Sequence, residues 1–219
     1  MRQFKMRASA SSKLLTAKGA VSKGETPRTM QREWFVSELT GKFKRIESKY
    51  FRRGNSMEDY SIKRIGKGIK NEEYFENEYF CGTPDILTED TVIDAKTPWD
   101  CFTFPFFMTE PPIEYVSQLQ VYMDLTGRRK AELSYCLENG SEEQIDKLMW
   151  KFAKEDELDE PSIENYDKAF AELNYDHLPD EIRIKTFKFE YDPKMIEALK
   201  EGVLLGREYI EDLKTKINK

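Results

Sequence analysis

One stretch decides the fold of this 219-residue chain: Gly82-Thr83-Pro84-Asp85, followed after a polar turn by Val92-Ile93-Asp94-Ala95-Lys96. It predicts two short strands around the turn 88–91, with Asp85 ending the first strand. Alternate residues of a strand point to one face, so Asp94 and Lys96 leave the second strand together. Two carboxylates with an ammonium beside them can hold Mg²⁺ next to a water molecule. The hairpin therefore indicates metal-assisted hydrolysis of a phosphodiester.

By themselves these residues also fit a surface hairpin with ordinary polar side chains. Pro84-Asp85 followed by Asp94-Ala95-Lys96 resembles the signature of the PD-(D/E)XK nuclease superfamily. The resemblance implies an α/β fold with the restriction-endonuclease-like core. In that core a central mixed sheet carries both aspartates on a hairpin and is flanked by helices on both faces.

A helix is predicted from about Pro111 to Leu125, because proline suits a first helical turn and Gly127 suits the C-terminal cap. Gln118 and Tyr122 lie four residues apart and share one face of this helix. Alone, the segment also fits a helix that packs its apolar residues and leaves its glutamines in water. Behind an Asp-x-Lys strand, Gln-x-x-x-Tyr resembles the extra motif of the RecB-like branch of the superfamily.

Two further motifs resemble the lambda exonuclease and YqaJ-like viral recombinase branch. They are Tyr115-x-x-Gln118-x-Gln120 and Lys96-Thr97-Pro98. The resemblance implies that Gln118 and Tyr122 support the lysine or contact the DNA backbone. It also makes Gln120 a candidate DNA contact.

A third carboxylate is expected upstream of the hairpin. Gly54-Asn55-Ser56-Met57-Glu58 resembles the Gly-x-x-x-Glu element of the YqaJ-like branch, which implies that Glu58 joins the two aspartates. Glu47 is the alternative, because one continuous helix would place both glutamates on the same face. Gly54 argues for a helix break between them, and this favours Glu58.

The resemblance also implies a role for each site residue. Mg²⁺, for which Mn²⁺ can substitute, would be bound by Asp85, Asp94, Glu58 and the Ala95 carbonyl. Lys96 would orient the attacking water and help to deprotonate it.

The charge of the chain is unevenly distributed. Residues 1–70 hold 18 Lys and Arg against 6 Asp and Glu, whereas residues 71–219 hold 17 against 35, for a net charge of −6. A basic third attracts phosphates, and the acidic remainder would keep DNA on one face. A solvated basic tail is the alternative. The candidate DNA contacts are arginines interleaved with aromatic residues: Arg28, Arg32, Arg52 and Arg53.

Length and composition, with 39% hydrophobic and 13% aromatic residues, predict one nuclease domain over residues 1–219. The Ser-, Lys- and Ala-rich residues 1–26 are expected to be partly ordered. Helices are expected in three early segments, at 29–39, 46–53 and 56–65.

The later part of the chain gives three expectations. The very apolar residues 102–108 predict a loop that packs over the sheet or forms a wall against nucleic acid. A change in the alternation of residues 182–191 predicts a β-bulge near 185–186. The 3-4 spacing of apolar residues in 196–217 predicts one long helix that covers the sheet, with pairing to a partner subunit as the alternative.

The composition also bears on the compartment. The chain has no apolar run of transmembrane length and no signal-peptide pattern. Its three cysteines, Cys81, Cys101 and Cys136, and its one histidine, His177, lack zinc or iron–sulfur spacing. We therefore expect reduced thiols in the cytoplasm of a bacterial or phage-infected cell.

The expected function is a metal-dependent exonuclease that digests linear duplex DNA from its ends for phage-type recombination. By analogy it forms a ring, with a trimer as first guess, and works with a single-strand annealing protein. The alternatives are an endonuclease, a CRISPR-associated RecB-like nuclease, or a catalytically inactive DNA-binding module. The CRISPR-associated kind usually carries a four-cysteine cluster, which three scattered cysteines cannot supply.

Overall fold

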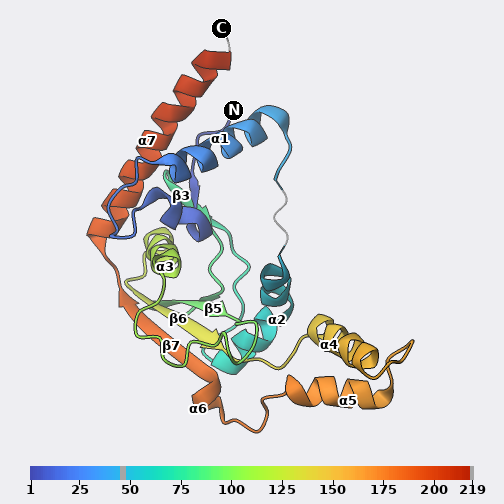
Figure 1. The fold of residues 1–219 in the computed structure, drawn as a ribbon. Coiled ribbons are helices and arrows are strands. Elements are labelled where there is room, and N and C mark those ends of the chain that lie inside the picture. Colours follow the sequence, from blue (N-terminus) through green and yellow to red (C-terminus); the bar gives the residue numbers. More distant parts are fainter. Residues whose placement is uncertain (45–47, 218–219) are drawn as a thin grey trace.

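The computed structural model describes residues 1–44 and 48–217, and a four-stranded mixed sheet lies at its centre (Figure 1). The antiparallel β4–β5 hairpin is followed by β6, parallel to β5, and by β7, antiparallel to β6. In sheet order the strands are β4 (Ile86–Leu87), β5 (Thr91–Lys96), β6 (Lys130–Cys136) and β7 (Ile184–Glu190).

Two helices cover opposite faces of β5. On one face Val92 joins a large core with Leu119 of α3 (Ile113–Thr126). On the other face Ile93 packs with Ile62 of α2 (Lys49–Ile65). The alternation of the strand thus divides its apolar residues between two layers, and the predicted α/β fold is confirmed.

A further layer covers α3. It consists of the 3₁₀ helix η1 (Ala8–Leu14), α1 (Glu25–Thr40) and α7 (Pro193–Ile217). The long helix α7 was expected to cover the sheet, but it packs mainly on α1, α3 and η1. Glycines permit this close contact, because a Cβ atom added at Gly206 would lie 2.7 Å from Gln31 Nε2.

The N-terminal segment, which was expected to be partly ordered, packs into the body of the protein. Phe4, Met6 and Leu14 are 4%, 2% and 0% exposed and belong to the main core. A second, three-stranded sheet includes this segment, with β1 parallel to β3. Its strands are, in order, β1 (Met6–Arg7), β3 (Phe80–Gly82) and β2 (Phe75–Glu76).

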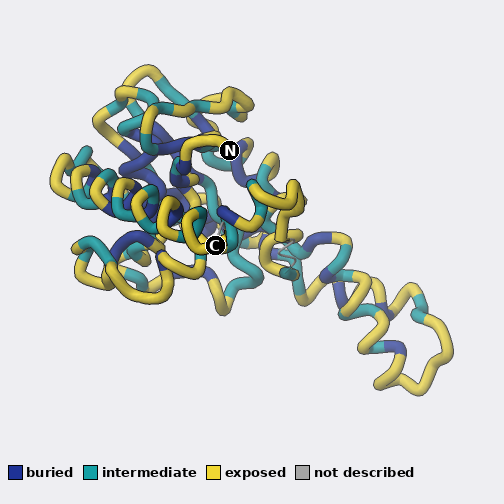
Figure 2. Tube along the Cα trace, turned by 90° about the horizontal axis from the view of Figure 1, so that it is seen from above, coloured by how far each residue is buried: buried dark blue, intermediate teal, exposed yellow. Residues whose placement is uncertain are grey.

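A helical hairpin projects from the body of the protein (Figures 1 and 2). It consists of α4 (Glu142–Glu155) and α5 (Ile163–Glu172). Both helices begin with a capping box, in which a serine and a residue three positions later satisfy each other's backbone N–H groups.

Two local expectations are also wrong. Helix α2 runs unbroken through Gly54, so the segments 46–53 and 56–65 share one helix where they are described. No bulge interrupts β7, which pairs in register with β6 from Ile184 to Glu190. The change in alternation arises because α6 (Asp180–Arg183) occupies the start of the expected strand. Glu47 lies outside the described residues.

Across residues 1–44 and 48–217, no helix combines the length and apolar character that crossing a membrane requires.

Candidate active site

The buried end of β5 holds a carboxylate against an ammonium. Asp94 is 1% exposed, and its Oδ2 atom lies 2.6 Å from Lys96 Nζ. The two side chains therefore share one face of the strand, as the spacing predicts. Burial opposes a charge on Lys96, but Asp94 and Asp85 outweigh it and raise the pKa of the ammonium.

Asp85 approaches the same place from the loop between β3 and β4. It immediately precedes β4, whereas the sequence suggested that it ends a strand. Its Oδ2 atom accepts a hydrogen bond from the Ala95 N–H at 2.8 Å. Burial, and next the charge of Asp94, raise the pKa of the Asp85 carboxyl to about 7. Two carboxylates are thus held together at a cost that a cation would relieve.

Helix α3 contributes Gln118 and Tyr122 to this centre. The Gln118 amide nitrogen donates to Asp94 Oδ1 at 2.8 Å and to the Tyr122 hydroxyl at 3.2 Å. Both residues were expected to support Lys96 or to contact the DNA backbone. In the structure Gln118 holds Asp94, the partner of Lys96. The aromatic contact to Lys96 comes from Tyr115, whose ring centroid lies 5.1 Å from Nζ.

Tyr122 reaches this position because Gly82 has no side chain. A Cβ atom added at Gly82 would lie 2.9 Å from Tyr122 Cε1. The glycine at the start of the decisive stretch therefore has a packing role that its pattern alone does not reveal.

One atom of the centre depends on a single close partner. Asp94 Oδ2 is buried, and the Lys96 ammonium lies 2.6 Å from it. Two carboxylates and the nearby Ala95 carbonyl are hard oxygen ligands, the kind that Mg²⁺ prefers. The residues present therefore fit a divalent cation between Asp85 and Asp94.

The expected third carboxylate is close but differently engaged. Glu58 lines the same cavity, yet its Oε1 atom pairs with Lys70 Nζ at 2.9 Å. Within the described ranges, no three Asp, Glu, His or Cys side chains are grouped so that they could hold one metal ion. The three-carboxylate cluster is therefore not formed in this arrangement.

Lys70 and Asn71, which no sequence motif singled out, also hold residues of the site. The Asn71 side chain donates to the Pro84 carbonyl at 2.9 Å, and its backbone N–H donates to the Asp85 carbonyl at 2.7 Å. Lys70 also pairs with Asp59, at 2.8 Å, beside its contact with Glu58. Asn71 thus fixes the backbone at Asp85, and Lys70 holds the side chain of Glu58. Their only signal in the sequence is a turn before the strands.

The centre opens into a cavity of about 580 Å³. Asp85, Lys96, Gln118 and Glu58 line it, together with aromatic residues from α2 and from the loop after β5. The cavity is wide enough to admit a ligand to the carboxylates, which a purely structural ion pair would not need.

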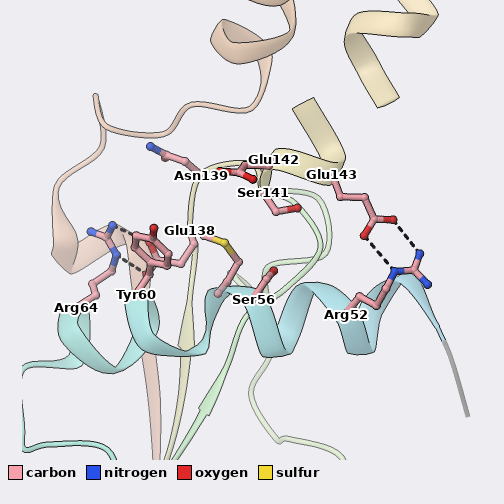
Figure 3. Close-up of a pocket in the computed structure, with 11 residues that line it drawn as sticks. Arg52, Ser56, Tyr60, Arg64, Glu138, Asn139, Ser141, Glu142 and Glu143 are labelled. Carbon is pink, nitrogen blue, oxygen red and sulfur yellow. Dashed lines mark hydrogen bonds and ion pairs between the residues drawn. The ribbon is translucent and has the colours of Figure 1, made fainter. Parts of the chain in front are cut away.

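A larger hollow, of about 710 Å³, lies along another face of α2 (Figure 3). Its arginines are paired across it: Arg52 with Glu143 at 2.8 Å, and Arg64 with Glu138 at 2.8 Å. These ion pairs join α2 to the root of the α4–α5 hairpin. The candidate active site is the smaller cavity, because Asp85 and Lys96 line that cavity and not the larger hollow.

Two arginines predicted to contact DNA have partners within the protein. Arg53 is 2% exposed and donates to the carbonyl oxygens of Pro98 and Glu138, at 2.8 and 2.9 Å, and to the side chain of Gln144. Arg52 binds Glu143. Arg53 therefore cannot reach a phosphate, because it fastens α2 to the segments after β5 and β6.

The other predicted contacts lie away from the carboxylates. Gln120 is 3% exposed and links α3 to the turn before α7, through the Glu190 carbonyl and the Asp192 N–H. Arg28 and Arg32 lie on α1 and pair with Glu25, and neither lines the cavity of Asp85.

Comparison with known proteins supplies relatives in structure alone. No family model matches the chain, and no curated protein matches its sequence. The fold is similar to that of a phage-related exonuclease from Haemophilus somnus 129PT, with a TM-score of 0.75 and 24% identity over 99% of this chain and 97% of the other.

It is also similar to the alkaline exonuclease LHK-Exo from Laribacter hongkongensis. The TM-score is 0.68, with 19% identity over 99% of this chain and 95% of that one. The same enzyme in complex with dAMP matches with a TM-score of 0.67 and 20% identity, over 98% of this chain and 93% of the other. At these identities the comparisons establish a shared fold over nearly the whole chain.

Proposed function

We propose that the chain is a metal-dependent deoxyribonuclease of the PD-(D/E)XK type. The observation that carries the proposal is that Asp85 and Lys96 line one cavity, while the buried Asp94 carboxylate lies 2.6 Å from the Lys96 ammonium. Likeness in fold to two exonucleases supports the same reaction class.

Asp85, Asp94 and the Ala95 carbonyl would hold Mg²⁺, or Mn²⁺ in its place. Bound there, the cation supplies Lewis-acid stabilisation of the phosphate and lowers the pKa of a bound water. Glu58 would add a ligand if its carboxylate left Lys70, which now lies 2.9 Å from it.

The chain's own residues would then position the reactants. Gln118 fixes the orientation of Asp94 by its hydrogen bond to Oδ1. Lys96 would direct an N–H bond from Nζ at the attacking water or at the phosphate. Nζ can accept the proton of the water only after it has lost its own, and sharing Asp94 with a cation favours that loss.

The proposed substrate is linear duplex DNA, digested progressively from an end to give single strands for phage-type recombination. A ring of identical subunits, a trimer as first guess, would keep the substrate enclosed between successive cuts. The single-stranded product would pass to an annealing protein. The cytoplasm is the proposed compartment.

A digestion assay tests the proposal directly. The protein is incubated with Mg²⁺ and a mixture of linear and covalently closed circular plasmid, with EDTA as the control. We expect the linear molecules to disappear and the circles to persist. Equal loss of circles would indicate an endonuclease, and no digestion with DNA binding retained would indicate an inactive binding module.

A further inference from the structure

Two phenylalanine rings on the loop that joins β5 to α3 are almost fully exposed to solvent. Phe102 is 93% exposed and Phe107 is 95% exposed. The apolar character of residues 102–108 suggested packing over the sheet or a wall against nucleic acid. The packing explanation holds for Phe104, which is 5% exposed, but not for these two rings.

Hydrogen bonds and an aromatic contact fix the part of the loop that lies between the two exposed rings. Asp100 and Thr103 exchange hydrogen bonds, with the backbone N–H of each donating to the side chain of the other at 2.9 Å. The buried Phe104 ring contacts Phe106 at a centroid distance of 4.6 Å. Lys185 of β7 donates to the Phe106 carbonyl at 2.8 Å. The loop is thus tied to the sheet between its two exposed rings.

The loop also forms part of the wall around the carboxylates. Trp99 and Thr103 line the cavity that contains Asp85 and Lys96. A lysine accompanies the aromatic wall, since Lys49 Nζ lies 4.6 Å from the centroid of the Trp99 ring. Aromatic rings interleaved with cations are the chemistry by which proteins bind unpaired nucleotides, through base stacking and phosphate attraction.

We propose that Phe102 and Phe107 form a stacking platform for unpaired nucleobases next to the candidate cleavage site. The proposal rests on the proposed nuclease function and specifies the form of DNA that the site takes: a strand whose bases are already out of the duplex. Lys49 and Lys185 contact this loop. Their positive charge favours nucleic acid over an apolar protein surface as the occupant, because it attracts a phosphate backbone.

The first test measures binding without cleavage. Fluorescence anisotropy in EDTA compares a labelled short oligothymidylate with a blunt duplex, for the full chain and for the double variant Phe102→Ala, Phe107→Ala. We expect affinity for the oligothymidylate to fall about tenfold or more, while duplex affinity changes little. Ile163→Ala is the control, because it removes an apolar side chain of 81% exposure on the projecting hairpin.

A second probe separates stacking from general contact. An oligonucleotide with abasic sites in place of the bases should bind the unaltered protein as weakly as oligothymidylate binds the double variant. Phe102→Trp with Phe107→Trp should restore tight binding, because indole also stacks. If the double variant binds oligothymidylate normally, or if abasic sites make no difference, the platform does not exist.

Cleavage gives a third measurement. At limiting substrate, duplex whose ends are already unpaired should be digested more slowly by the double variant, with a smaller loss on blunt duplex, for which the affinity is expected to change little. An equal loss on both would overturn the proposal.

A protein that cleaves nothing yet binds oligothymidylate through these rings would contradict the nuclease function alone. If the substitutions lower the mass in light scattering and leave oligothymidylate binding intact, the rings contact another copy of the chain and the proposal fails.

Discussion

The β4–β5–α3 unit and helix α2 use buried charge in opposite ways. Around β5, the carboxylates of Asp85 and Asp94 approach one another and share the charge of one ammonium, that of Lys96. On α2, by contrast, the buried Arg53 has acceptors on three separate segments. Unbalanced charge stores an electrostatic cost that a ligand can relieve, whereas balanced charge holds elements together. This difference, and not the number of charged residues, distinguishes a reactive site from a structural one.

Removal of Lys96 should give the largest effect. Lys96→Ala takes away the only ammonium that lies within 4 Å of Asp94 among the described residues. We expect digestion of linear DNA to slow by about 10³-fold or more, with the fold and DNA affinity retained. The rate of digestion in Mg²⁺ and the far-ultraviolet circular dichroism spectrum check this.

Lys130→Ala is the matched control, because Lys130 lies on the neighbouring strand and pairs with the exposed Asp90. Cleavage by Lys96→Ala at a rate close to that of the Lys130 variant would remove Lys96 from the chemistry. Loss of the folded structure would make its role structural.

Adjacent arginines on α2 give the second contrast. Arg53→Ala leaves buried carbonyl groups without donors and should lower the free energy of unfolding by about 2–4 kcal/mol. Arg52→Ala breaks an exposed ion pair and should cost less than about 1 kcal/mol. Urea unfolding of both variants measures the difference. Equal values would show that Arg53 is not the fastening residue described above.

The same contrast explains how much the sequence could predict. The period of a strand fixes which of its residues share a face, and the relative placement of Asp94 and Lys96 was therefore predicted correctly. The period of a helix did the same for Gln118 and Tyr122. Arg53 was predicted to contact DNA, and its structural role was missed, because its partners lie more than forty residues away along the chain. No periodicity reports such distant partners.

Other errors have the same origin. Gly54 did not break α2, because tertiary packing on the sheet outweighs the low helix propensity of one glycine. The pairing of β1 with β3 was not predicted, because the two strands lie far apart along the chain. Lys70 and Asn71 gave no recognisable pattern, since their role depends on where Glu58 and Asp85 meet in space.

Asp85→Asn should separate stability from function. The raised pKa of Asp85, about 7 against an ordinary 3.8, means that the stability contributed by its protonated form is lost as pH rises through 7. Without metal at pH 8, Asp85→Asn should therefore be about 1–2 kcal/mol more stable than the unaltered protein, and the gain should vanish near pH 4.

Urea unfolding in EDTA at the two pH values measures this gain, and the digestion assay should show that the variant no longer cleaves. Mg²⁺ should stabilise the unaltered protein at pH 8 more than the variant. A variant that is less stable at pH 8 would show that Asp85 is balanced by its surroundings, as Arg53 is, and the contrast between the two regions would fail.

The smallest expected effect comes from Asn71, which lies outside both regions and holds the loop of Asp85. Asn71→Ala removes the hydrogen bond to the Pro84 carbonyl but keeps the backbone bond to Asp85. Because the backbone hydrogen bond still holds the Asp85 loop, the Mg²⁺ concentration for half-maximal cleavage should rise only about three- to tenfold. Asn174→Ala is the control, since that side chain binds the exposed Asp176 on a distant loop.

If Asn71→Ala changed the free energy of unfolding but not the Mg²⁺ requirement, the residue would stabilise the turn alone. A changed Mg²⁺ requirement at unchanged stability would instead extend the reactive site one residue beyond the carboxylates, to the backbone that positions them.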